Sequence, residues 1–264
     1  MQSSAEYIPH CQYILDNSSH SYALLVAATA LTKLITTHWN NFTAPQHVEI
    51  RNYMLNYLAT KGPQLQDFVS KSLIQLVCRS TKLGWFDDQQ HREITQEVTK
   101  FLTASSTHRI LGLQILNQLV EELNIPLSGR TLTQHRKTAV AFRDSCLLEI
   151  FNMSLNVLQQ LVQGAVTGIS PEENLAMSTQ GLNLAVKCLS FDFIGTNPDE
   201  SADDVGTIQV LWLSYSPLHP FHPFHPFLVR SDSRLRFPPV LNYPTPVYTC
   251  YSTPALRFRA RGEE

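Results

Sequence analysis

The chain has 264 residues, 43% of them hydrophobic, so it is long enough to bury the core of one large domain or two small ones. Its net charge of −2 excludes an overall basic field that would draw it to nucleic acid or to an anionic membrane surface. The N-terminus lacks the features of a signal peptide, and the longest apolar run is too short to span a bilayer. Five scattered cysteines fit a reduced cytosolic or nuclear protein.

In chain order, the sequence predicts helices separated by short turn signals. Apolar residues recur at three- and four-residue spacing in seven segments: 21–36, 48–59, 65–85, 91–102, 108–123, 135–163 and 170–191. Gly84 is expected to end a helix, and a break is expected near Asp144. Ser170, Pro171 and Glu173 predict a capping box at the start of the last helix. No strand pattern of comparable strength appears.

The spacing of these helices predicts a repeat. The three most apolar helices begin near Ser21, Leu65 and Thr107, 44 and 42 residues apart, and each follows a more polar helix. A period of roughly 40–47 residues with two helices per unit is typical of HEAT-type repeats, whose pairs stack to bury the faces that one pair leaves open. We therefore expect an all-α, HEAT-repeat-like α-solenoid over residues 1–210. An irregular all-α domain is the alternative.

The composition changes near Val210. The last 55 residues hold nine of the 15 prolines and carry a net charge of +3, whereas residues 1–209 carry −5. Residues 211–264 mix Pro, Phe, His, Tyr and Arg without periodicity, so we expect an unstructured, disordered tail. In an extended polyproline conformation the three histidines of HPFHPFHPF (219–227) would stand about 9 Å apart, too far to share one zinc ion.

The sequence shows no catalytic constellation. It has no glycine-rich phosphate loop, no G-x-S-x-G elbow, no H-E-x-x-H helix and no CxxC pair. We therefore predict that the protein is not an enzyme and takes no cofactor or metal ion.

A polar row stands out on the predicted helix 65–85. Its members are spaced i, i+4, i+8 and i+11, which places them on one helix face: Lys71, Gln75, Arg79 and Lys82. Such a row is commonly a solvated face. In a solenoid, however, the inner helices line a concave surface, where these groups would meet an acidic partner.

Acidic residues gather in FDFIGTNPDESADD, directly after the last predicted helix. They are Asp192, Asp199, Glu200, Asp203 and Asp204. The segment lacks the glycine and terminal glutamate of an EF-hand loop, so calcium binding is not expected. It is either an exposed acidic loop or a docking site for a basic segment.

Several long segments resemble one family. SYALLVAATALTKLI, IRNYMLNYLAT, TKLGWFDD, HRKTAVAFRDSCL and CLSFDFIGTNPDESADD are together similar to the N-terminal part of the exportin-7 and Ran-binding protein 17 family of the importin-β superfamily. The resemblance runs in order from about Ser4 to Val210. It implies long HEAT-repeat solenoids that shuttle cargo through nuclear pores, with Ran-GTP setting the direction.

On this resemblance, the expected function is that of an exportin. Ran-GTP, protein cargo and nuclear pore components would be its partners, without nucleic acid or membrane, and it would shuttle between cytoplasm and nucleus. Helices 21–36, 65–82 and 107–123 would face Ran, with the polar row on the middle one. The alternative is a generic α-solenoid scaffold that binds another helix or tail without Ran.

Two departures from the family pattern lead us to expect a truncated receptor. Family members begin with an additional amphipathic helix, whereas MQSSAEYIPHCQYIL enters after that point, which would leave an apolar face exposed. The family also continues beyond GTIQV, where this chain reads LWLSYSPLHPFHPFHPF. A divergent coding end of this kind would remove most of the cargo-binding surface.

Overall fold

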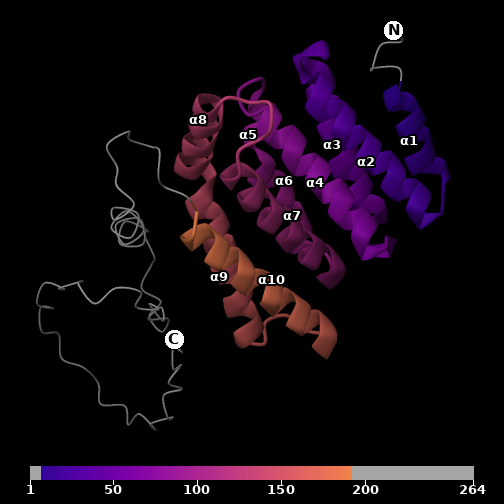
Figure 1. Cartoon of the computed structure of the whole chain (residues 1–264). Coiled ribbons are helices and arrows are strands. Elements are labelled where there is room, and N and C mark those ends of the chain that lie inside the picture. Colours follow the sequence, from indigo (N-terminus) through magenta and orange to yellow (C-terminus); the bar gives the residue numbers. More distant parts are fainter. Residues whose placement is uncertain (1–6, 192–264) are drawn as a thin grey trace, which may run out of the picture. The chain divides into compact units, whose positions relative to one another are not determined.

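Helices pair in chain order along residues 7–191, the part of the chain that the computed structural model describes (Figure 1). The pairs are α1 (Tyr7–Asn17) with α2 (Ser21–His38), α3 (Ala44–Lys61) with α4 (Asp67–Leu83), α6 (Ile94–Thr103) with α7 (Ser106–Asn124), and α9 (Leu148–Val162) with α10 (Pro171–Leu189). The other elements lie between them: the 3-10 turns Trp39–Asn41 and Gly62–Gln64, α5 (Gln89–Arg92), α8 (Leu132–Phe142) and a π-helical turn, Arg143–Leu147. This part of the chain contains no strand.

The second helices of the pairs form one layer, which we call the α4 layer: α2, α4, α7 and α10. Within it α2 packs on α4, α4 on α7, and α7 on α10, and each helix also contacts the first helix of its own pair. Contacts on several sides explain why α7 is apolar around much of its circumference, with Leu113, Leu116, Leu119 and Leu123 fully buried. Stacked helix pairs of this kind confirm the predicted HEAT-like α-solenoid.

Two helix boundaries are set by local residues that the sequence analysis identified: the start of α10 and the end of α4. The predicted capping box is present, because the Glu173 backbone N–H donates to Ser170 Oγ (3.2 Å) and the Ser170 N–H donates to Glu173 Oε2 (2.9 Å). Gly84 follows α4 as predicted. A Cβ at this position would lie 2.4 Å from Nε2 of the buried His91, so only glycine fits without displacing the imidazole.

The seven predicted segments give no bounds for the more polar helix before Ser21, which the structure shows to be α1. Its Ile8, Cys11 and Leu15 are buried, and the Leu15 carbonyl accepts a hydrogen bond of 2.9 Å from the Tyr57 hydroxyl on α3. From the family pattern we expected an exposed apolar face in the first repeat. Helix α1 covers apolar surface of α2 there. On α2, Tyr22 and Val26 remain 68% and 66% exposed.

One predicted segment differs from the structure, and another is interrupted where the sequence predicted it. Residues 91–102 form two helices, α5 and α6, rather than one. The long segment 135–163 is interrupted near Asp144, as predicted, by the π-helical turn between α8 and α9. None of the helices in the described part is both long and apolar enough to cross a bilayer. The predicted boundary at residue 210 and the predicted tail 211–264 lie outside the described residues.

Candidate functional site

The open face of the α4 layer carries a groove lined by all four of its helices, with a volume of about 720 Å³. We call it the α4-layer groove. Predicted row members Lys71 and Gln75 lie in it beside Phe68 of α4. The other helices contribute Leu25 and Thr29 from α2, Gln114, Asn117, Gln118 and Glu121 from α7, and Gln180, Asn183 and Lys187 from α10.

Side-chain amides dominate this groove. Asn117 Nδ2 donates to the Leu113 carbonyl (2.9 Å), the Gln180 carbonyl (2.9 Å) and Gln180 Oε1 (3.2 Å), and so ties α7 to α10. Its Oδ1 atom is buried and has no hydrogen-bond partner among the described residues. Because an amide both donates and accepts, such a surface suits the mixed polar groups of a folded protein partner.

The charged side chains on the groove are paired with each other. Lys71 Nζ lies 2.6 Å from Asp67 Oδ2, one turn earlier on α4, and Lys187 Nζ lies 2.6 Å from Glu121 Oε2, which joins α10 to α7. These side chains are well exposed, at 36% to 67% of their surface, so each pair adds little to stability. Both ammonium groups stay accessible to a partner.

Arg79 does not extend freely from the α4 layer. Its guanidinium forms a bidentate ion pair with the Glu122 carboxylate on α7, through Nε and through Nη2 (3.3 Å to Oε2). Nη1 also donates to Thr36 Oγ1 on α2 at 3.4 Å. The Arg79 and Glu122 side chains are only 17% and 7% exposed. Arg79 therefore connects three helices of the layer.

Lys82 closes the C-terminal end of α7. Its Nζ donates to the Glu122 carbonyl (2.6 Å) and to the Ile125 carbonyl, groups that have no partner within the helix. Burial lowers the pKa of Lys82 to about 8, with Arg79 acting in the same direction and Glu122 in the opposite one. A cation at the negative end of the α7 dipole is stabilising there.

The predicted polar row is thus divided between surface and interior. Lys71 and Gln75 line the groove, whereas Arg79 and Lys82 are committed to contacts with α7. The solvated-face reading is wrong for Lys82, which is 6% exposed. The predicted acidic residues Asp199, Glu200, Asp203 and Asp204 lie outside the described residues.

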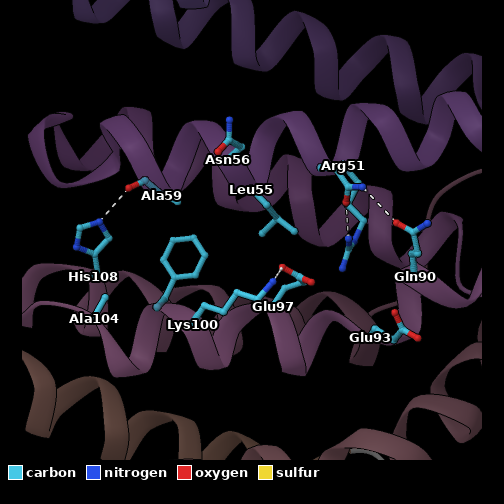
Figure 2. Close-up of a pocket in the computed structure, with 12 residues that line it drawn as sticks. Arg51, Leu55, Asn56, Ala59, Gln90, Glu93, Glu97, Lys100, Ala104 and His108 are labelled. Atoms are coloured by element: carbon cyan, nitrogen blue, oxygen red, sulfur yellow. Dashed lines mark hydrogen bonds and ion pairs between the residues drawn. The ribbon is translucent and has the colours of Figure 1, made fainter.

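A second groove, which was not predicted from the sequence, lies between α3 and α6 (Figure 2). Arg51 of α3 points into it, 2% exposed, and its Nη1 donates to Asn52 Oδ1 at 2.7 Å. Nε and Nη2 have no hydrogen-bond partner among the described residues. Burial lowers the pKa of Arg51, an effect opposed by Glu97, Glu93 and Asp88. Arg51 thus keeps two buried donors that no described residue uses.

Sequence reasoning missed several residues that build these surfaces. Glu122 sits in the predicted helix 108–123, where an acidic residue among apolar ones signals an internal partner. The amides of α7 and α10 carry no comparable signal, because Gln and Asn on a helix usually face water. Residues 7–191 contain no group of three or more His, Cys, Asp or Glu side chains arranged to hold a metal ion.

Comparison with known proteins finds one family model and several relatives that match this chain. Residues 1–60 match the family model "Importin-beta N-terminal domain". The chain is 45% identical over 211 residues to exportin-7-A of Xenopus laevis, and 40% identical over 212 residues to Ran-binding protein 17 of Homo sapiens. Each match covers 78% of this chain and 19% of the relative, so the chain spans about a fifth of the length of these curated relatives. Exportin-7 of Dictyostelium discoideum is 26% identical over 160 residues, 60% of this chain and 15% of the relative.

Proposed function

Because the chain belongs to the exportin-7 and Ran-binding protein 17 family of the importin-β superfamily, we propose that it binds the GTP-bound form of the small GTPase Ran and acts in nuclear protein export. The observation that carries this proposal is the α4-layer groove, to which all four second helices contribute. Relatives that match most of this chain are named as exportins and as Ran-binding proteins.

The α4-layer groove is the surface we assign to Ran. It is open along four neighbouring helices, and its amides and two accessible ammonium groups provide hydrogen-bond donors and acceptors over a broad area. An open surface with polar groups spread over four helices fits a folded partner better than a small molecule, whose sites are more enclosed and mostly apolar. Lys71 and Gln75 are the predicted residues that this assignment retains.

Export cargo, nuclear pore components and shuttling between cytoplasm and nucleus belong to the same proposal. Their support is the family membership rather than any residue of the groove. Since the chain spans about a fifth of its relatives' length, we assign Ran, not cargo, to the described helices.

The test is a fluorescence titration of the full chain against Ran loaded with a non-hydrolysable GTP analogue, with Ran-GDP as the comparison. We expect saturable binding to the GTP form alone. If the chain is helical by circular dichroism but binds neither form, the proposal is refuted, and an α-solenoid scaffold that acts without Ran is favoured.

A matched pair of variants locates the surface. Lys71→Glu reverses a 67% exposed charge on the groove, and Lys100→Glu reverses a 71% exposed charge on α6, each beside an acidic residue on its own helix. A reversed charge within the interface should weaken binding by roughly three- to tenfold, whereas one outside it should leave binding unchanged. Equal effects of the two variants would count against the α4-layer groove as the Ran surface.

A further inference from the structure

A basic pocket of about 270 Å³ lies where the end of α4 meets α8. We call it the α8 pocket. Three cationic side chains line it, Lys82, Arg130 and Lys137, together with the ring of Phe86. Lys137 Nζ lies 4.7 Å from the centre of that ring, which holds the ammonium group at the mouth of the pocket.

Negative charge is scarce at the α8 pocket. Among the described residues that line it, Asp87 supplies the one carboxylate, and Oδ2 of Asp87 already accepts from Trp39 Nε1 (2.9 Å) and lies 3.2 Å from His47 Nδ1. Arg130 and Lys137 have no ion-pair partner within residues 7–191. In a body whose first 209 residues carry a net charge of −5, this pocket is a local excess of positive charge.

The described chain ends beside this pocket. Phe191, 1% exposed, packs on Phe142 at the end of α8, with ring centres 5.8 Å apart, and Phe142 packs on Trp85 at 5.6 Å. Lys137 lies five positions before Phe142 on α8, a rise of about 7.5 Å. Phe191, the last described residue, therefore lies about one helical turn from the lining of the α8 pocket.

The sequence that follows Phe191 is acidic. Asp199 comes eight residues after it and Asp204 thirteen, with Glu200 and Asp203 between them. Eight extended residues reach about 26 Å, well beyond the distance to Lys137. A short tether of this length gives the attached segment an effective concentration in the millimolar range, so even weak charge pairing would keep it bound.

We propose that the α8 pocket binds the acidic segment 199–204 of the same chain. The carboxylates pair with Arg130 and Lys137, and buried Lys82 adds positive charge behind them. This contact is separate from the α4-layer groove, so it holds whether or not the chain binds Ran.

Carbodiimide cross-linking of the full chain tests the proposal, because this reagent joins a lysine amine to a carboxylate only where the two touch. We expect mass spectrometry to find Lys137 joined to residues 199–204 at low salt, with the yield severalfold lower in about 1 M NaCl, where charges are screened within about 3 Å. Exposed Lys33 on α2 is the control lysine and should not join this segment. Absence of the Lys137 product, or equal yields at Lys33, would overturn the proposal.

Arg130→Glu separates charge attraction from mere proximity, since it leaves the Lys137 amine in place. The cross-link yield should fall severalfold in this variant, while Lys100→Glu should leave it unchanged. Cross-linking an equal mixture of isotope-labelled and unlabelled chain identifies the occupant. Products within one chain support the proposal, whereas products that join two chains in statistical proportion would replace it with a contact between copies.

A peptide measurement gives an independent result. A fluorescent peptide of residues 196–206 should bind at least tenfold more tightly to a chain whose segment is neutralised by D199N, E200Q, D203N and D204N than to the natural chain, whose own segment competes. Equal affinity for both chains would show that the pocket is open in the natural protein and would refute the intramolecular contact.

Discussion

Replacing Arg79 by Met should destabilise the fold strongly, because the substitution leaves the carboxylate of Glu122 buried without its bidentate partner. Met keeps most of the aliphatic stem of Arg79, so the loss is chiefly electrostatic. The two side chains are 17% and 7% exposed, and breaking a pair this well buried costs about 3–5 kcal/mol. Lys82 Nζ, bonded to the Glu122 carbonyl, offsets part of this, so we expect about 3 kcal/mol.

Urea unfolding followed by circular dichroism at 222 nm measures this cost, with Lys71→Met as the matched control. Lys71 belongs to the same polar row but forms an exposed pair with Asp67, and its loss should cost about 0.5 kcal/mol or less. Adding Glu122→Leu to Arg79→Met should restore stability to within about 1 kcal/mol of the natural chain, because no buried charge is then left alone. If Arg79→Met costs no more than Lys71→Met, Arg79 is not the internal connector described above.

Three further outcomes follow from the same contacts. Tyr57→Phe removes the hydroxyl that donates to the Leu15 carbonyl at 2.9 Å and should lower the unfolding free energy by about 1 kcal/mol, with faster amide exchange in α1. Burial, aided by nearby Arg51, lowers the pKa of His91 from 6.5 to about 4. As the pH falls, the unfolded chain therefore takes up this proton before the folded chain does. The free energy of unfolding, measured in urea titrations, should fall by about 3 kcal/mol as the pH is lowered from 6.5 to 4. His91→Leu should remove this pH dependence. Ser170→Ala breaks the capping box at α10 and should lower the free energy of unfolding by about 1 kcal/mol in thermal or urea unfolding. Ser19→Ala, which lies outside any helix, should leave this free energy unchanged.

Periodicity and capping chemistry predicted most of the fold. The apolar stripes located α2, α4, α7 and α10, and the Ser170 capping box fixed the start of α10, because these signals lie within one helix. The bounds of helix α1 were not predicted, although Ile8, Cys11 and Leu15 have helical spacing. Pro9 occupies the first turn of α1, where its missing N–H costs nothing.

The candidate site was predicted only in part, because its residues come from four helices. Spacing alone placed Lys71, Arg79 and Lys82 on one face, but it could not show that α7 lies against half of that face. Burial of Lys82 depends on the carbonyls at the end of α7, which exist as acceptors only once the helices have packed. The α8 pocket likewise requires Lys82 and Lys137, 55 residues apart, to meet across the fold.

The π-helical turn at Arg143–Leu147 sets the phase between α8 and α9. A π turn accommodates one residue more than an α-helical turn, so every side chain after it is rotated by about 100° relative to an uninterrupted helix. This offset lets α8 direct Phe142 toward Trp85 while α9 directs its buried stripe toward α10. Removing one residue from the turn would regularise the helix and cancel the offset. The α8 pocket and the α9–α10 interface could not then both keep their present alignment, so this one irregular turn allows a single long helix to serve two neighbours.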